Sequence, residues 1–193
     1  MIIKDWKKEI LTVPNLLSLF RLLLIPVYVM IYINASKPDD YFLAAAILAV
    51  SCLTDLVDGK IARHFNMVST VGKILDPLAD KATQFTLIVC LAIKHRIVRY
   101  MVGIFFIKEM FQLIAGIISI RKGRMLRGAL LTGKICTTVL FISLIIMILM
   151  PDLQESLINT ITLIDIAFLT LSFVDYVSTY LFRTTRFEPI EKI

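Results

Sequence analysis

The chain has 193 residues, of which 58% are hydrophobic and 19% are charged, and its mean hydropathy is +0.83. An ordinary soluble domain is only about 45–50% apolar, so this composition excludes a soluble globular protein and indicates an integral membrane protein. The formal net charge of +6 is spread over many loops, which favours contact with anionic lipid over contact with nucleic acid.

The apolar runs predict the fold. Runs of about 20 residues, long enough to cross a bilayer core, occur six times along the chain. The first eleven residues are too charged for a signal sequence and predict an interfacial amphipathic helix, followed by a membrane core at 12–182. We therefore expect an all-α integral membrane fold and a single domain over 1–193. The predicted spans lie at 15–34, 41–59, 78–95, 98–120, 130–150 and 157–181.

The basic residues of the loops predict the orientation. Loops rich in Lys and Arg face the cytoplasm by the positive-inside rule. The loops that emerge on one side carry only Lys37, Lys94, Arg96 and Arg99, so we expect both termini on the other side, in the cytoplasm. The basic residues expected on the cytoplasmic side are Lys4, Lys7, Lys8, Lys60, Arg63, Lys73, Arg121, Lys122, Arg124, Arg127, Arg183, Arg186 and Lys192.

Four aspartates flank the connection between the second and third predicted spans. Asp55 and Asp58 are three residues apart, and Asp76 and Asp80 are four apart, so each pair lies on one face of a helix. Near the bilayer centre each carboxylate costs roughly 2.5–3.5 kcal/mol, and only cations offset such a cost. Ion pairs are one way to do so, and a divalent metal is the other. The candidate ion-pair partners are Arg21, Lys81, Lys108 and Lys134.

A divalent metal fits the four aspartates better than isolated ion pairs do. All four side chains offer oxygen ligands, which suit Mg²⁺ or Mn²⁺ and leave coordination positions for phosphate oxygens. Gly59 follows Asp58 directly and has no Cβ, so a bulky ligand can approach the backbone there. Arg63 is suited to bind a phosphate bidentately. These residues predict phosphoryl-group chemistry on a lipid at the cytoplasmic face of the cell membrane.

The same stretch resembles a family signature. Written out, it is Asp55-x2-Asp58-Gly59-x2-Ala62-Arg63-x8-Gly72-x3-Asp76-x3-Asp80, which resembles the signature of the CDP-alcohol phosphatidyltransferase family with every position filled. The segment from Val13 to Pro26, the sequence DPLADK and the pair Gly133-Lys134 are also similar to bacterial phosphatidylglycerophosphate synthases and CDP-diacylglycerol-dependent cardiolipin synthases.

The resemblance implies a reaction and a set of roles. Members transfer a phosphatidyl group from CDP-diacylglycerol to an alcohol, release CMP, use Mg²⁺ or Mn²⁺, here two ions, and are commonly homodimers. Asp80 is the implied general base. The implied metal ligands are Asp55, Asp58, Asp76 and Asp80, and the residues implied to border the CDP moiety are Asp58, Gly59, Ala62, Arg63 and Gly72.

The acceptor alcohol is less strongly specified. In the phosphatidylglycerophosphate synthases an Arg-Glu pair in the fourth span is followed, seven residues after the Glu, by an arginine suited to glycerol 3-phosphate. Here the corresponding residues are Lys108, Glu109 and Gly116. Glycerol 3-phosphate is our first expectation, and phosphatidylglycerol, which gives cardiolipin, is the second. A divalent-cation transporter is a third interpretation. The candidate acceptor-binding residues are Arg21, Lys81, Lys108, Arg121 and Lys134.

Overall fold

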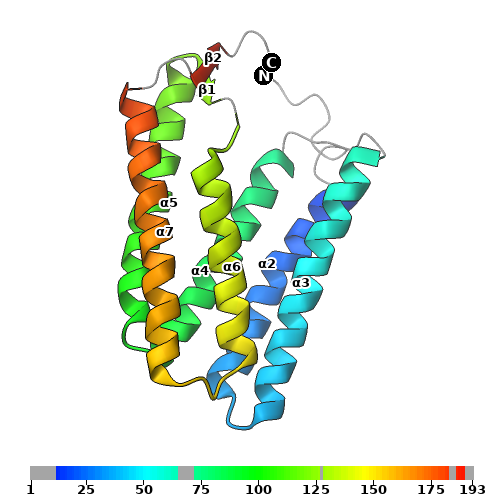
Figure 1. The fold of residues 1–193 in the computed structure, drawn as a ribbon. Coiled ribbons are helices and arrows are strands. Elements are labelled where there is room, and N and C mark those ends of the chain that lie inside the picture. Colours follow the sequence, from blue (N-terminus) through cyan, green and yellow to red (C-terminus); the bar gives the residue numbers. More distant parts are fainter. Residues whose placement is uncertain (1–11, 65–71, 127, 183–185, 190–193) are drawn as a thin grey trace. The chain divides into compact units, whose positions relative to one another are not determined.

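A computed structural model of the chain describes residues 12–64, 72–126, 128–182 and 186–189. This part forms six helices and one two-stranded ribbon (Figure 1), so the expected all-α fold is confirmed apart from the ribbon. The predicted interfacial helix at 1–11 lies outside the described residues. The elements are α2 (Val13–Asn34), α3 (Pro38–His64), α4 (Gly72–Lys94), α5 (Val98–Arg121), β1 (Arg124–Leu126), α6 (Leu131–Leu149), α7 (Glu155–Phe182) and β2 (Phe187–Pro189).

Four of the described helices, α2, α5, α6 and α7, are long and apolar enough to cross a membrane, so the chain is a multi-pass membrane protein. The expectation of six spans was wrong for the described part of the chain. In α4, Asp76, Asp80, Lys81 and Lys94 break the apolar run. In α3, the run of described side chains is too short to qualify.

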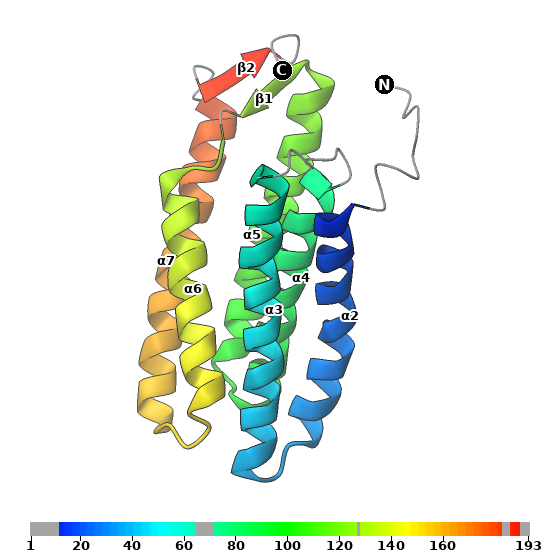
Figure 2. The same cartoon turned by 90° about the vertical axis from the view of Figure 1, so that its right-hand side faces the viewer.

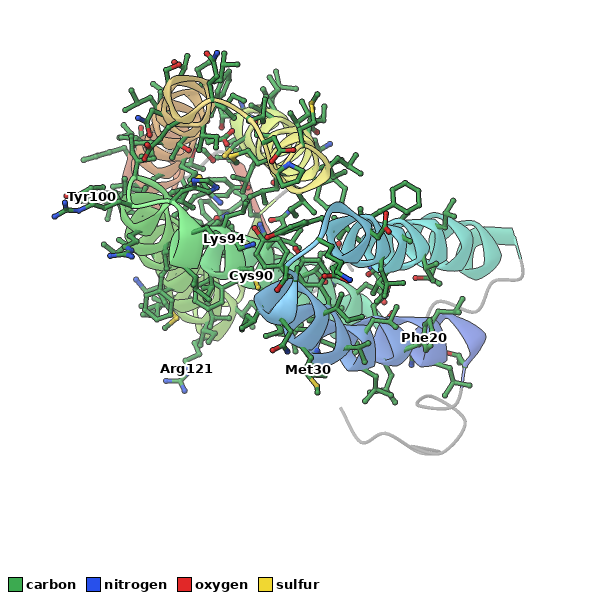
Figure 3. All side chains as sticks on the ribbon, turned by 90° about the horizontal axis from the view of Figure 1, so that it is seen from below. Phe20, Met30, Cys90, Lys94, Tyr100 and Arg121 are labelled. Carbon is green, nitrogen blue, oxygen red and sulfur yellow. The ribbon has the colours of Figure 1, made fainter. Side chains whose placement is uncertain are left out.

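Many large apolar side chains are exposed on the helices and several polar side chains are buried among apolar ones, which is the arrangement expected in lipid. On α2 the buried side chains include Asn15, Ser18 and Arg21, whereas Leu23 and Met30 are more than 60% exposed. Figure 3 shows Met30 projecting away from α2 and Tyr100 projecting away from α5. This inversion supports the membrane assignment independently of helix length.

The chain divides into two compact units, Met1–Cys90 and Leu91–Ile193. In the first unit α2 packs along α3 (Figure 2), and a three-residue connection joins them. The backbone N–H groups of Ser36 and Lys37 donate to Asp40 Oδ2 at 2.9 and 3.0 Å, which lowers the pKa of that carboxyl and fixes the start of α3.

In the second unit α7 packs against both α5 and α6. The buried residues of α7 alternate in steps of four and three, which places them on one face of the helix. Strands β1 and β2 pair antiparallel with Met125 opposite Glu188, and this ribbon joins the end of α5 to the segment that follows α7 (Figure 1). The buried residues of the α7 face are Ile158, Thr162, Asp165, Leu169, Ser172, Tyr176 and Thr179.

Candidate active site

Two of the predicted site aspartates meet one arginine in the first unit. Asp76 and Asp80 lie one turn apart on α4, and Ser18 and Arg21 lie three residues apart on α2, so each helix presents both groups on one face. Arg21 Nη1 donates to Asp80 Oδ1 at 2.5 Å, and Arg21 Nη2 lies 3.9 Å from Asp76 Oδ1. The Ser18 hydroxyl donates to Asp76 Oδ1. One buried arginine therefore links both carboxylates.

The arginine is buried, whereas the two carboxylates that it holds are partly exposed. Arg21 is only 2% exposed, whereas the side chains of Asp76 and Asp80 are 39% and 46% exposed. Behind Arg21 a small crevice of about 20 Å³ is lined by apolar side chains, among them Leu48 and Leu87, and by hydroxyl groups such as those of Ser51 and Thr83. The guanidinium is thus enclosed within the first unit, whereas the two carboxylates are partly exposed.

The remaining signature residues lie on the helices where the sequence placed them. Asp55, Asp58, Gly59, Ala62 and Arg63 belong to the last turns of α3, and Gly72 is the first residue of α4. The two expected helices are therefore confirmed for the backbone, and the connection between them, 65–71, lies outside the described residues. The side chains of these residues lie outside the described part of the structure, so their convergence with Asp76 and Asp80 stays a prediction.

The donor set at this position suits a hard divalent cation. Asp76 and Asp80 supply carboxylate oxygens from adjacent turns of α4, and both side chains are accessible. Among the described side chains no group of three His, Cys, Asp or Glu residues gathers to hold a metal. Asp55 and Asp58, the other two predicted ligands, lie on the single helix α3 as the sequence predicts, and their part in a metal site stays a prediction.

Pro77 sits between the two aspartates and affects the local backbone. It lies inside α4, five residues after the helix begins. Because proline has no N–H, the carbonyl of Lys73 receives no helical hydrogen bond from residue 77. The turn that carries Asp76 and Asp80 therefore retains an extra backbone acceptor.

The predicted acceptor-binding residues are divided between the two units, with Arg21 and Lys81 in the first and Lys108, Arg121 and Lys134 in the second. Lys81 is half-buried in the first unit, whereas Arg121 and Lys134 are exposed in the second, where Figure 3 shows Arg121 projecting away from α5.

Lys108 is 3% exposed in the second unit. Its ammonium donates to Glu109 Oε1 at 2.6 Å and to Gln112 Oε1 at 2.8 Å, and lies 6.0 Å from the centre of the Tyr176 ring. The ammonium group of Lys108 therefore makes these hydrogen bonds to side chains of its own helix, α5.

Sequence reasoning missed two residues that shape these clusters. Ser18 holds Asp76, and its signal was the spacing of Asn15, Ser18 and Arg21, three polar residues at three-residue intervals in an otherwise apolar run. Tyr176 faces Lys108 in the second unit. No sequence pattern distinguishes Tyr176 from the other aromatic residues of the last span.

Comparison with known proteins identifies the family. A sequence model described as CDP-alcohol phosphatidyltransferase matches residues 11–174. That range contains the whole stretch from Asp55 to Asp80 together with Ser18 and Arg21. It also contains Lys108.

Individual relatives divide between two activities. A cardiolipin synthase (CMP-forming) of Streptomyces coelicolor is 37% identical over 75 residues, which cover 38% of this chain and 35% of that protein. A CDP-diacylglycerol--glycerol-3-phosphate 3-phosphatidyltransferase of Rickettsia bellii is 44% identical over 69 residues, 35% of this chain and 37% of that protein. A cardiolipin synthase (CMP-forming) / mitochondrial hydrolase fusion protein of Schizosaccharomyces pombe is 44% identical over 90 residues, 46% of this chain and 14% of that protein. The chain spans about a third or less of the length of these curated relatives.

Proposed function

We propose that this chain, which belongs to the CDP-alcohol phosphatidyltransferase family, transfers a phosphatidyl group from CDP-diacylglycerol to an alcohol and releases CMP. The observation that carries the proposal is the filled signature from Asp55 to Asp80, in which Asp76 and Asp80 share the buried Arg21 and remain accessible. Accessible carboxylates near the start of α4, held by an arginine of the membrane helix α2, suit a reaction on a lipid phosphate.

In the proposed reaction Asp80 accepts the proton of the acceptor hydroxyl, whose oxygen forms a bond to the β-phosphorus of the donor. The bond between that phosphorus and the oxygen of CMP breaks, and CMP leaves with the electron pair. Asp55, Asp58, Asp76 and Asp80 are the proposed ligands of two Mg²⁺ or Mn²⁺ ions. When bound, such ions neutralise charge on the pyrophosphate and on the leaving CMP.

The nucleotide side of the site is proposed from the signature. Gly59, Ala62 and Gly72 have little or no side chain, so the CDP moiety can lie close to the ends of α3 and α4. Arg63 supplies a bidentate phosphate contact, and Asp58 borders both metal and nucleotide. We further propose that this site faces the cytoplasm and that the enzyme works as a homodimer.

For the acceptor we propose glycerol 3-phosphate first. The segment from Val13 to Pro26 and the pair Gly133-Lys134 support this choice through their similarity to the corresponding synthases. Exposed cations near the end of α5, Arg121 and Lys122, offer charge to a phosphorylated acceptor. The relative from Rickettsia bellii carries the name of this activity.

Phosphatidylglycerol is the second candidate, and two observations favour it. Lys108, which replaces the arginine of the Arg-Glu pair, is buried and donates to Glu109 and Gln112. Gly116 stands where a phosphate-binding arginine is expected, and it offers no side chain. A site without that phosphate contact suits a lipid acceptor, and two of the relatives described above are named cardiolipin synthases.

A competition experiment decides between the acceptors. Purified protein in detergent receives CDP-diacylglycerol, Mn²⁺ and equal concentrations of glycerol 3-phosphate and phosphatidylglycerol, and the lipid products are identified by mass spectrometry. Phosphatidylglycerophosphate as the main product supports the first candidate. Cardiolipin as the sole product would replace it with the second, and the absence of both products would contradict phosphatidyl transfer to either alcohol.

A further inference from the structure

Arg21 approaches two candidate catalytic aspartates, Asp76 and Asp80, with a different terminal nitrogen directed at each. Nη1 lies 2.5 Å from Asp80 Oδ1, and Nη2 lies 3.9 Å from Asp76 Oδ1 and donates to Ser18 Oγ at 3.4 Å. Ser18 in turn donates to Asp76. The planar guanidinium therefore fixes Asp80 directly and Asp76 through a hydroxyl, using two nitrogens held at a fixed separation that the single nitrogen of an ammonium group lacks.

The surroundings of Arg21 restrict its movement. The residue is 2% exposed and Ser18 is completely buried, so neither reaches bulk water. The crevice beside Arg21 is lined by apolar side chains such as Leu24, Ile25 and Leu48 and by the neutral hydroxyl groups of Tyr28, Ser51, Thr83 and Thr86, so it offers the guanidinium no counter-charge. Retreat of the guanidinium from the carboxylates would leave a buried charge without an ionic partner, and that is costly. Arg21 is therefore held against α4.

We infer that Arg21 is a positioning residue that holds Asp80, and with Ser18 also Asp76, in the orientation required for phosphatidyl transfer. The inference rests on the proposed function and goes beyond the acceptor-binding role expected for Arg21 from the sequence. The accessible faces of both aspartates remain open to ligands, while the buried arginine sets their direction from behind. Arg21 itself does not touch the reacting atoms.

The positioning role and an acceptor-binding role predict different kinetics. If Arg21 contacted the acceptor, its removal would mainly weaken acceptor binding and so raise the KM for the alcohol. A misplaced base leaves acceptor binding intact and lowers kcat, and a displacement of about 1 Å can cost roughly a hundredfold in rate. The ratio of the two effects therefore separates the roles.

The variants to compare are Arg21→Gln, Arg21→Lys and Ser18→Ala, each purified in detergent as the full chain. Arg99→Gln is the matched control, because the Arg99 guanidinium donates to the Ala92 carbonyl at 3.1 Å and makes no contact with the aspartates of α4. For each protein, kcat and the KM of the acceptor are measured. The Mn²⁺ dissociation constant is measured without substrate by electron paramagnetic resonance of the free ion.

For Arg21→Gln we expect kcat to fall between roughly tenfold and a hundredfold while the KM of the acceptor changes less than about threefold. Mn²⁺ binding should be retained or tighter, because a cation beside the carboxylates is removed. Arg21→Lys should keep only part of the rate, since an ammonium keeps the charge but has one donor nitrogen in place of the rigid two-nitrogen fork. Arg99→Gln should match the parent in all three quantities.

Two results would overturn the inference in a parent enzyme that releases CMP. A rise of tenfold or more in the KM of the acceptor at unchanged kcat would make Arg21 an acceptor-binding residue, and unchanged kcat and KM would remove its role. If Arg21→Gln does not fold, Ser18→Ala is the deciding variant. A threefold or greater loss of kcat in Ser18→Ala would support the inference, and an unchanged kcat would contradict it. A parent protein that binds Mn²⁺ but releases no CMP would instead contradict the proposed function.

Discussion

Gly133 tests the packing of the second unit, because a methyl group at this position has no room. An alanine Cβ at 133 would lie 2.7 Å from Tyr176 Oη and 2.9 Å from Tyr176 Cε2, both far inside normal contact distance. The Tyr176 ring is 6% exposed, stacks with Tyr180 at 6.5 Å between ring centres and lies beside Lys108. Either the enclosed Tyr176 ring has to shift against its neighbours or α6 and α7 have to move apart, and both disturb the packing.

The expected magnitude follows from measured costs of overpacking. Inserting a methyl group into a well-packed core costs about 1–3 kcal/mol. For a chain of this size each kcal/mol shifts the midpoint by roughly 2–4 °C, so Gly133→Ala should lower the Tm by about 2–12 °C. The assay is thermal unfolding in detergent followed by intrinsic fluorescence.

Matched glycine variants isolate the steric effect. An alanine at Gly116 meets only Tyr180 Oη at 3.8 Å, and an alanine at Gly103 meets no heavy atom within 4 Å. Both changes bring the same gain in helix propensity without the clash. Adding Tyr176→Phe to Gly133→Ala removes the nearest atom and should recover part of the loss. A Tm for Gly133→Ala equal to that of Gly116→Ala would refute the packing argument.

Three further predictions concern chemistry and topology. Asp80→Asn should leave the protein folded and able to bind CDP-diacylglycerol, measured by ligand-dependent thermal shift, yet lower turnover at least roughly a hundredfold, as expected for a general base; turnover near the parent rate would exclude that role. Gly116→Arg should raise the share of phosphatidylglycerophosphate among the products, because it restores a charged phosphate contact worth roughly 1.5–3 kcal/mol; an unchanged product ratio would contradict the missing-contact explanation. In a cysteine-free background, a cysteine at Met125 should react with a membrane-impermeant maleimide only from the cytoplasmic side and one at Ser36 only from outside; the reverse pattern would invert the proposed orientation.

The sequence predicted the helices well because bilayer thickness limits their length. The run predicted at 98–120 is the helix Val98–Arg121, and the run predicted at 15–34 differs from Val13–Asn34 by two residues at one end. The β1–β2 ribbon could not be predicted, since each strand has three residues and its partner lies far away in the sequence. The assignment of six spans was wrong because it counted the apolar run of α4 as a span and disregarded the charged residues in that helix.

The site was predictable as a set of residues but not as a set of contacts. The spacing of Asp76 and Asp80 put both on one helix face, which the structure confirms. Four cations were possible partners, and it is the side-chain contact between α2 and α4 that selects Arg21. Likewise, nothing in the sequence shows that Lys108 is directed at Glu109, because the direction of a side chain depends on its tertiary surroundings.

The most direct test of the central claim is the release of radiolabelled CMP from CDP-diacylglycerol by the purified chain. With Mn²⁺ and a mixture of glycerol 3-phosphate and phosphatidylglycerol, we expect CMP to appear in proportion to the phospholipid product. EDTA should abolish the release, and added Mn²⁺ should restore it. The absence of CMP release under all these conditions, or release unaffected by EDTA, would contradict metal-dependent phosphatidyl transfer.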